Sequence, residues 1–208
     1  MTVERTDYGR HRLDESAVDA DPMVQFDRWF AEAVSAGVAE ANAMTVATVG
    51  DSGPDARIML LKEADRRGFV FYTDYRSTKG RELDRMARAA LVFFWQPLER
   101  QVRIRGDVER VSEAESDAYF ATRPEGSRVG AWASRQSGVL SNRDALEAAL
   151  AKAAARFEGK PIPRPEHWGG FRVVPDLIEF WQGRPNRLHD RIRYHRTADG
   201  WARERLSP

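Results

Sequence analysis

Hydrophobic and polar positions recur with two different periods along this chain, and each period predicts one class of element. After an Asp21-Pro22 start signal, apolar side chains recur every three or four residues from Met23 to Val34, which predicts a helix over residues 22–36. From residue 43 onward most apolar residues alternate with polar ones, as they do in half-buried strands. Strands are predicted at residues 43–49, 56–62, 69–73, 90–96, 100–111, 170–174, 177–182, 191–196 and 201–206.

Short turns connect most of these strands and indicate antiparallel pairing. Turn residues at 50–54 and 65–68 predict that the first three strands form an antiparallel meander. Further helices are predicted at residues 77–88, 112–120 and 142–157, the last of them capped by Ser141. The pattern therefore predicts a mainly β (α+β) fold, an antiparallel Greek-key-like barrel with peripheral helices.

Composition narrows the possible functions. The 208 residues include 33 Lys plus Arg, 32 Asp plus Glu and no cysteine, which excludes disulfide scaffolds, cysteine-ligated metals and thiol nucleophiles. A net charge of +1 provides no overall field for nucleic acid. The longest apolar run, residues 89–95, is too short to span a membrane, and the N-terminus shows no signal-peptide core. We expect a cytoplasmic protein with a flexible N-terminal arm (residues 1–20), a single domain (residues 21–208), and neither nucleic acid nor membrane as a partner.

Candidate anion-binding residues occur in two places. Glycine-rich phosphate-binding motifs are missing from the sequence, so side chains must hold any phosphate. Arg57 and Lys62 stand at the two ends of an apolar strand and are predicted to point to opposite faces; bound anions would explain them, and so would charges that reach solvent. Tyr119, Arg123 and Ser127 follow one another at intervals of four residues, and all three can donate hydrogen bonds to a phosphate.

A second group of polar residues lies near the C-terminus. His189 stands within a few residues of Arg184, Arg187 and Arg191. A metal site is not predicted, because no carboxylate pair stands at ligand spacing; a buried structural histidine is the alternative to a functional one. Earlier in the chain, the carboxamide of Gln101 could both donate to and accept from a heteroaromatic ring. Hydrolytic catalysis is not supported, since no Ser/His/Asp arrangement or paired-carboxylate motif stands out.

Seven blocks, taken in order, resemble the pyridoxine/pyridoxamine 5′-phosphate oxidase family of flavin enzymes. The resemblance runs from about residue 8 to residue 208. The blocks are RIMLLK (57–62), FYT (71–73), LERQV (98–102), GAW (130–132), RQS (135–137), HWGGFR (167–172) and IEFWQG (178–183) with RLHDR (187–191). This resemblance implies an FMN-binding split barrel and a homodimer with FMN at its interface. It also implies an oxidoreductase that acts on a CH–NH2 group with O2 as acceptor and yields pyridoxal 5′-phosphate and hydrogen peroxide from a phosphorylated pyridine.

The resemblance also implies a role for individual residues. The residues implied to bind FMN are Arg57, Ile58, Met59, Leu60, Leu61, Lys62, Tyr72, Thr73, Lys79, Gln101, Gln136, Ser137, Trp181 and Arg191. Those implied to bind substrate are Lys62, Tyr119, Arg123, Ser127, Arg187, Leu188 and His189, of which Arg187 and His189 are the implied catalytic residues. Arg5 and Tyr8 are implied to belong to an arm that closes the site.

One position departs from the family pattern. The family commonly has Ser-Arg-Lys where this chain has Ser77-Thr78-Lys79, so one phosphate-binding arginine is missing, and Arg76 or Arg81 could replace it. Two alternatives stay open. One is another enzyme on the same barrel, such as a phenazine-pathway oxidase or a deazaflavin-dependent reductase. The other is a non-catalytic protein that binds flavin or pyridoxal phosphate.

Overall fold

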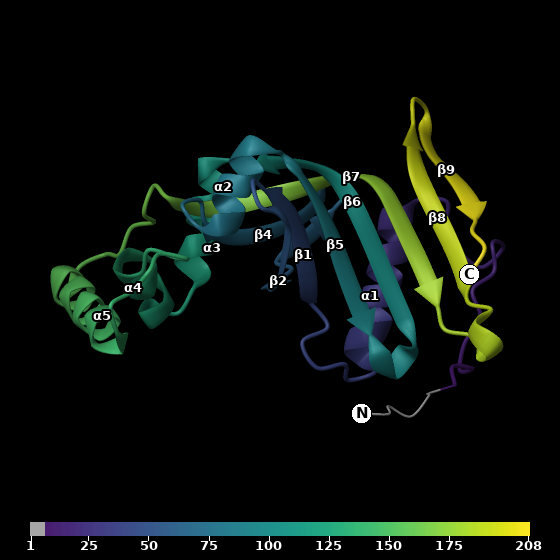
Figure 1. Cartoon of the computed structure of the whole chain (residues 1–208), viewed down its shortest axis with the longest axis horizontal. Coiled ribbons are helices and arrows are strands. Elements are labelled where there is room, and N and C mark those ends of the chain that lie inside the picture. The colour runs from purple at the N-terminus through teal and green to yellow at the C-terminus, as the bar shows by residue number, and fades with distance from the viewer. Residues whose placement is uncertain (1–6) are drawn as a thin grey trace.

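The computed structural model describes residues 7–208, which form one antiparallel sheet with helices at its periphery (Figure 1). The α-helices are α1 (Pro22–Ser35), α2 (Thr78–Arg85), α3 (Glu113–Thr122), α4 (Glu125–Ala133) and α5 (Arg143–Phe157). The strands are β1 (Ala43–Gly50), β2 (Gly53–Leu60), β3 (Glu63–Asp65), β4 (Gly68–Asp74), β5 (Arg88–Trp95), β6 (Arg100–Arg110), β7 (Trp168–Gln182), β8 (Asp190–Thr197) and β9 (Gly200–Arg205). The predicted mainly β fold with peripheral helices is confirmed. None of the described helices is long and apolar enough to cross a bilayer.

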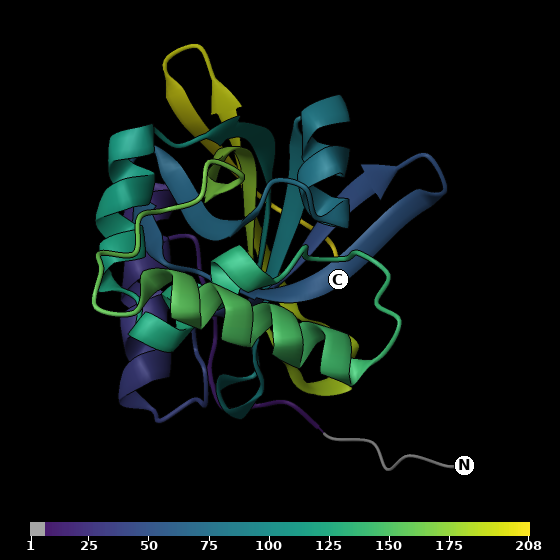
Figure 2. The same ribbon diagram turned by 90° about the vertical axis from the view of Figure 1, so that its left-hand side faces the viewer.

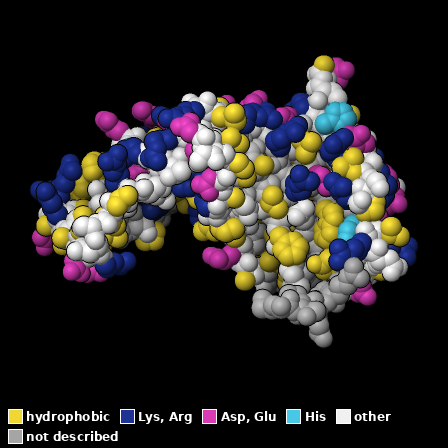
Figure 3. All heavy atoms as spheres, in the orientation of Figure 1, with side chains coloured by type: hydrophobic (Ala, Val, Ile, Leu, Met, Phe, Trp, Pro, Cys, Tyr) yellow, Lys and Arg dark blue, Asp and Glu magenta, His cyan; other side chains and the backbone are white. Residues whose placement is uncertain are grey.

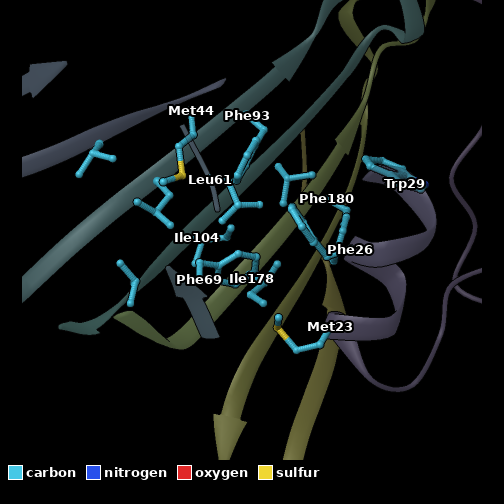
Figure 4. Close-up of a cluster of buried hydrophobic side chains, with 14 of the residues drawn as sticks. Met23, Phe26, Trp29, Met44, Leu61, Phe69, Phe93, Ile104, Ile178 and Phe180 are labelled. Carbon is cyan, nitrogen blue, oxygen red and sulfur yellow. The ribbon is translucent and has the colours of Figure 1, made fainter. Parts of the chain in front are cut away.

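Helix α1 packs its apolar face onto the concave side of the sheet. It begins at the predicted cap, where the Asp21 carboxylate accepts a hydrogen bond from the backbone N–H of Met23 at 2.8 Å. Phe26 is almost fully buried, with its ring centroid 4.9 Å from that of Phe69 in an edge-to-face contact. Trp29 makes the same kind of contact with Phe180 at 5.2 Å. These aromatic contacts lie at the centre of the hydrophobic core (Figure 4).

The sheet order is β2-β1-β5-β6-β7-β4-β3, and the β8–β9 hairpin extends it from β7. The predicted hairpin of the first two strands is present as β1 and β2. The prediction that the third strand continues this hairpin as a meander is wrong, because β4 pairs with β3 and β7 and not with β2. The chain leaves the sheet after Leu60, and the three-residue strand β3 forms its own hairpin with β4. This hairpin joins the sheet at the edge opposite β2.

Strand β7 is a single strand of 15 residues, where the sequence pattern predicted two strands at 170–174 and 177–182. The pairing with β6 shifts register between Arg105 and Gly106, so that Asp176 is an extra residue beside Pro175. A side chain at Gly106 would lie 2.0 Å from the carbonyl oxygen of Val174, so only glycine fits this bulge. The proline and the bulge interrupt the alternation of apolar residues without ending the strand.

Two local features of the helices differ from the predictions. Helix α4 was not predicted, since Pro124, Gly126 and Gly130 are weak helix formers. Helix α5 is capped by Asn142 and not by Ser141; its carboxamide oxygen accepts from the N–H of Ala145 at 2.9 Å. Together α4 and α5 cover one end of the molecule (Figure 2).

The segment before α1 lies against the opposite end of the sheet. The backbone N–H of Gly9 donates to the Glu99 carboxylate at 2.8 Å, and the Tyr194 hydroxyl donates to the carbonyl of Asp19 at 2.6 Å. The Leu13 side chain is buried. The flexibility of residues 1–20 stays a prediction, and Arg5 lies outside the described residues.

Candidate active site

A cavity of about 720 Å³ opens between the sheet and the helices α3 and α4. The molecule is visibly hollowed between the α4–α5 lobe and the body of the sheet (Figure 3). Strands β2 and β4 supply one wall, the end of α3 and the length of α4 supply the other, and the start of β7 closes it. The lining residues are Ile58, Met59, Leu60, Lys62, Tyr72, Thr73, Asp74, Tyr119, Thr122, Arg123, Pro124, Ser127, Gly130, Ala131, Ser134, Gln136 and Trp168.

Lys62, Tyr119, Arg123 and Ser127 all line this cavity. Helix α3 places Tyr119 one turn before its C-cap Arg123, and Ser127 follows in the first turn of α4. Lys62 comes from a distant part of the chain, just after β2, with its ammonium 6.0 Å from the centroid of the Tyr119 ring. The structure therefore brings together all four residues predicted to bind the substrate phosphate.

Arg123 is held by an aromatic face and not by an acid. Its guanidinium lies 4.5 Å from the centroid of the Trp168 ring, and its Nη1 atom is buried without a hydrogen-bond partner. Burial lowers the pKa of Arg123 from its ordinary value, although a guanidinium remains charged at any physiological pH. Within residues 7–208 no carboxylate forms an ion pair with Arg123 or Lys62. This end of the cavity is positively charged and suited to an anion.

Aromatic rings form the wall beside these cations. The rings of Tyr72 and Tyr119 are stacked, with centroids 4.0 Å apart, and Trp168 lies nearly parallel to both. Burial and the nearby carboxylates of Glu63 and Glu115 raise the pKa of Tyr72 to about 12. The Tyr72 hydroxyl therefore stays protonated over the physiological range and remains a hydrogen-bond donor.

A buried lysine lies behind the other end of the cavity, which Thr73 and Gln136 line. Lys79 is 6% exposed, and its ammonium donates to the hydroxyl of Thr73 at 3.1 Å. Thr73 in turn donates to the carboxamide oxygen of Gln136 at 2.9 Å, and the neighbouring Ser137 hydroxyl accepts from the N–H of Thr78 at 3.2 Å. Burial, and then the charge of Arg57, lower the pKa of Lys79. No ion pair of Lys79 is present in the described part of the chain, so this cation too lacks an acidic partner in contact.

Besides Gln101 and the C-terminal residues, four of the predicted cofactor residues do not line the cavity: Arg57, Leu61, Lys79 and Ser137. The guanidinium of Arg57 is held behind it by the carboxylate of Glu82 at 3.1 Å and by the hydroxyl of Thr48. Leu61 is buried in the core, and its backbone N–H donates to the carbonyl of Asn42 at 2.8 Å. The expected alternation of Arg57 and Lys62 on opposite faces is interrupted, because β2 ends at Leu60.

Residues of the C-terminal group gather at a second place. The Trp181 ring centroid lies 4.6 Å from that of His189, and both Gln101 and Arg191 pair with Trp181 across neighbouring strands. Tyr8 packs edge-to-face on Trp181 at 5.8 Å. Arg187 and Leu188 are exposed and complete this cluster.

The backbone around Arg187 is unusual. Asn186 and Arg187 both have left-handed backbone angles, with φ of 56° and 62°, in the short segment Pro185–Arg187. Such conformations cost free energy in residues with a side chain and are concentrated at functional sites. The turn projects Arg187 away from the protein, and no ion pair of its guanidinium is present in residues 7–208.

His189 is held in its neutral form. Its Nδ1 atom accepts a hydrogen bond from the backbone N–H of Arg184 at 3.1 Å, which requires an unprotonated nitrogen. Burial lowers the pKa of His189, and the positive charge of Arg187 lowers it further. The negative charge of Asp190 acts in the other direction and raises this pKa. Protonation of Nδ1 would break this hydrogen bond, and the lowered pKa moves that protonation to a lower pH than in an ordinary histidine.

NMR titration of the His189 ring is expected to give a pKa below 6.5 in the wild-type protein. Arg187→Gln is expected to raise this pKa, because it removes a like charge, and Asp190→Asn is expected to lower it further. His195, on β8, provides an internal reference in the same spectra. A His189 pKa at or above 6.5, or one that does not respond to Arg187→Gln, would contradict this arrangement.

The two clusters lie at opposite ends of β7. Trp168 begins the strand at the cavity, and Trp181 lies 13 residues further on, about 43 Å along the strand at 3.3 Å per residue. Strand β7 runs from the side of α3 to the side of β8 (Figure 1). A single chain therefore does not bring Arg187 and His189 to the cavity that contains Lys62 and Arg123.

Sequence reasoning missed several residues of the site. Trp168 stands in one of the family blocks, but only the fold shows that its ring supports Arg123. Glu82 and Thr48 hold Arg57 from two other elements, and no spacing in the sequence links them. Asp74 also lines the cavity, where its carboxylate is paired with Arg76 at 2.8 Å.

The fold and this cavity define a protein of the flavin-binding split-barrel class. A pyridoxamine 5′-phosphate oxidase-related, FMN-binding protein from Nostoc punctiforme shares the fold, with a TM-score of 0.70 at 19% identity over 88% of this chain and 97% of its own. A phenazine-pathway protein, PhzG from Burkholderia lata, solved with tetrahydrophenazine-1-carboxylic acid, gives a TM-score of 0.87 at 33% identity over 93% of this chain and 95% of its own.

Family models assign the chain more narrowly. Residues 30–157 match the model for pyridoxamine 5′-phosphate oxidase, and residues 168–208 match the C-terminal dimerisation region of pyridoxine 5′-phosphate oxidase. A pyridoxine/pyridoxamine 5′-phosphate oxidase from Thermosynechococcus vestitus is 62% identical over 98% of this chain and 97% of its own, and one from Rubrobacter xylanophilus is 57% identical over 98% and 94%. The chain belongs to the pyridoxine/pyridoxamine 5′-phosphate oxidase family, a family of oxidoreductases.

Proposed function

We propose that this protein is an FMN-dependent oxidase that converts pyridoxamine 5′-phosphate and pyridoxine 5′-phosphate to pyridoxal 5′-phosphate. The observation that carries this proposal is positive charge at both ends of one cavity: Lys62 and Arg123 line one end, and Lys79 lies directly behind Thr73, which lines the other. None of these three cations has an ion-pair partner in the described residues. A phosphorylated cofactor and a phosphorylated substrate would each supply one of the missing anions.

The residues present fit FMN. A lysine buried to 94% with only hydroxyl partners, Thr73 at 3.1 Å and Ser77 at 3.5 Å, is a costly arrangement unless an anion completes it. Lys79, Gln136 and Ser137 would hold the phosphate and the ribityl chain, while Tyr72, Thr73 and the cavity-lining residues Ile58, Met59, Leu60 and Lys62 would contact the remainder. Arg57 is paired with Glu82 and would need to release that carboxylate to join them. When bound, FMN would supply the redox chemistry, namely acceptance of a hydride from the substrate C4′ and transfer of two electrons to O2 to give hydrogen peroxide.

The residues of this chain would bind the substrate and orient it. Lys62, Arg123, Tyr119 and Ser127 would hold the substrate phosphate by charge-assisted hydrogen bonds. Two fixed phosphates set the distance between the pyridine and the flavin, and this positioning lowers the entropic part of the barrier. The imidazole of neutral His189 would contact the substrate, and the Arg187 guanidinium would stabilise charge that develops on it.

We infer that each site is built from two copies of the chain. Arg187, Leu188 and His189 of one copy would cover the cavity of the other, together with Gln101, Trp181 and Arg191. The separation of the two clusters along β7 supports this inference, and so does the match of residues 168–208 to a dimerisation region. A homodimer with two-fold symmetry would form two identical sites.

A visible absorption spectrum tests the proposed function. Protein loaded with FMN is expected to lose its flavin absorption on anaerobic addition of pyridoxamine 5′-phosphate and to regain it in air, with hydrogen peroxide and ammonia as products. Unphosphorylated pyridoxamine at the same concentration is the matched control and is expected to bleach the flavin far more slowly. A flavin that binds but is not reduced by the phosphorylated substrate would contradict the proposal.

A phenazine-pathway oxidase is the second candidate function, because PhzG superimposes with a TM-score of 0.87. The two cations beside Tyr119, Lys62 and Arg123, match a doubly charged phosphate better than a singly charged carboxylate such as that of tetrahydrophenazine-1-carboxylic acid. Reduction of the bound flavin by tetrahydrophenazine-1-carboxylic acid, without reduction by pyridoxamine 5′-phosphate, would favour this second function.

A further inference from the structure

The first turn of α2 carries an unusual concentration of positive charge. Arg76, Lys79 and Arg81 lie within six residues of one another, and the first turn contains no acidic residue. Ser77 is the N-cap, and its hydroxyl accepts from the N–H of Gly80 at 3.2 Å. Since the N-terminus of a helix is the positive end of its dipole, cations there are unfavourable unless an anion accompanies them.

Arg76 forms an ion pair with the carboxylate of Asp74. Its Nη2 atom lies 2.8 Å from one oxygen of Asp74 and its Nε atom 3.1 Å from the other, which is a bidentate ion pair. The Asp74 carboxylate also accepts from the backbone N–H of Arg76 at 2.7 Å, and it is buried. Arg76 is therefore neutralised and oriented by a partner of its own.

Arg81 has no such partner. Its side chain folds back along the helix, with Nη2 3.4 Å from the hydroxyl of Thr78 and Nη1 donating to the carbonyl of Arg76. Residues 7–208 place no carboxylate within ion-pair distance of this guanidinium. Folding back brings the charge of Arg81 toward the positive end of the helix dipole, where a bound anion would stabilise it.

The same turn is joined to the cavity through hydrogen bonds. The N–H of Thr78 donates to the hydroxyl of Ser137 at 3.2 Å, and the ammonium of Lys79 donates to Thr73, which lines the cavity. Arg81, which contacts Thr78, therefore lies close to the end of the cavity that Thr73 and Gln136 line.

We propose that Arg81 binds the phosphate of the flavin cofactor, together with Lys79 and Ser137. It would thereby replace the arginine that the family commonly has at the position of Thr78. This inference rests on the proposed function, because it requires a phosphorylated flavin at this end of the cavity. Its basis is the geometry of the two arginines: in residues 7–208 the Arg81 guanidinium lies at the turn with only neutral oxygens as partners, whereas the Arg76 guanidinium is paired with Asp74.

Flavin binding to the apoprotein tests this role without any need for turnover. Quenching of flavin fluorescence gives dissociation constants for FMN and for riboflavin, which lacks the phosphate. Arg81→Gln is expected to weaken FMN binding by about tenfold or more, as for the loss of one charge-assisted hydrogen bond, and to leave riboflavin binding unchanged. Arg85→Gln is the matched control, since Arg85 lies one turn further along α2 and is paired with Asp51; its FMN affinity is expected to stay at the wild-type value.

A rescue variant separates a local role from a general disturbance of α2. Thr78→Arg in the Arg81→Gln background is expected to restore most of the FMN affinity. Equal FMN binding by Arg81→Gln and wild type would overturn the role of Arg81 alone and leave the proposed function standing. Equal losses for FMN and riboflavin would also overturn it, because the effect would then not involve the phosphate. Failure of the wild-type protein to bind FMN would overturn the proposed function and this inference together.

Discussion

Arg187→Ala is expected to lower turnover of pyridoxamine 5′-phosphate by about two to three orders of magnitude while FMN affinity changes by less than about threefold. Arg187 is exposed on a turn with left-handed backbone angles, without an ion-pair partner in residues 7–208. It lies far from Lys79 and Gln136 along the chain's own sheet, so it does not hold the cofactor phosphate of its own copy. The expected loss therefore appears in the chemical step.

Stopped-flow reduction of the bound flavin measures that step directly. Arg196→Ala is the matched control, because Arg196 is also an exposed arginine of the C-terminal hairpin, where it stacks on Trp201 at 4.4 Å. It is expected to reduce flavin at the wild-type rate. Loss of bound flavin from Arg187→Ala, with normal reduction of whatever flavin remains, would place Arg187 among the residues that hold the cofactor.

Mixing two inactive variants is expected to restore activity. Arg123→Ala removes the phosphate contact in the cavity, and Arg187→Ala removes the exposed arginine at the far end of β7, so each homodimer is expected to be nearly inactive. In a mixed dimer, one site receives both intact residues and the other receives both substitutions. Random reassociation makes half of the dimers mixed, each with one of its two sites intact, so about a quarter of the wild-type activity is expected.

Differently tagged copies of the two variants provide the measurement. Tandem affinity purification isolates the mixed dimer, which is expected to show about half of the wild-type activity per dimer. The same procedure with two tagged copies of Arg123→Ala serves as the control and is expected to show none. An inactive mixed dimer would mean that both residues act in one chain, and the two-copy site would then be wrong.

The elements that local sequence determines were predicted well. Helix α1 begins at its predicted cap, and the first hairpin has its predicted partners, because both depend on residues a few positions apart. The pairing of β4 with β7 joins residues about a hundred positions apart, and nothing in the pattern of β4 distinguishes β7 from β2 as its neighbour. The continuity of β7 could not be predicted for the same reason. It depends on the bulge opposite Gly106, which is defined by the pairing of β7 with β6.

In the candidate site, too, the local arrangement of residues was predicted and the contacts between distant parts of the chain were not. The spacing of Tyr119, Arg123 and Ser127 placed them near one helix end, and the structure finds them in one cavity. The arrival of Lys62 beside them depends on the tertiary fold. Both Arg76 and Arg81 lie within one helical turn of Thr78. The sequence therefore could not show that, in residues 7–208, Arg76 forms an ion pair with Asp74 and Arg81 forms none.

The length of β7 carries a consequence for how this chain can change. One continuous strand connects the wall of the cavity at Trp168 to the cluster around Trp181. Deleting two residues would keep every side chain on its own face, yet it would shorten the strand by about 7 Å. Such a deletion could still fold, but it would displace each half of a shared site from the other. If each site is built from two copies as proposed, insertions and deletions should be tolerated in exposed connections such as residues 138–142 and excluded from β7, because the length of this strand would then set the distance between the two halves of each site.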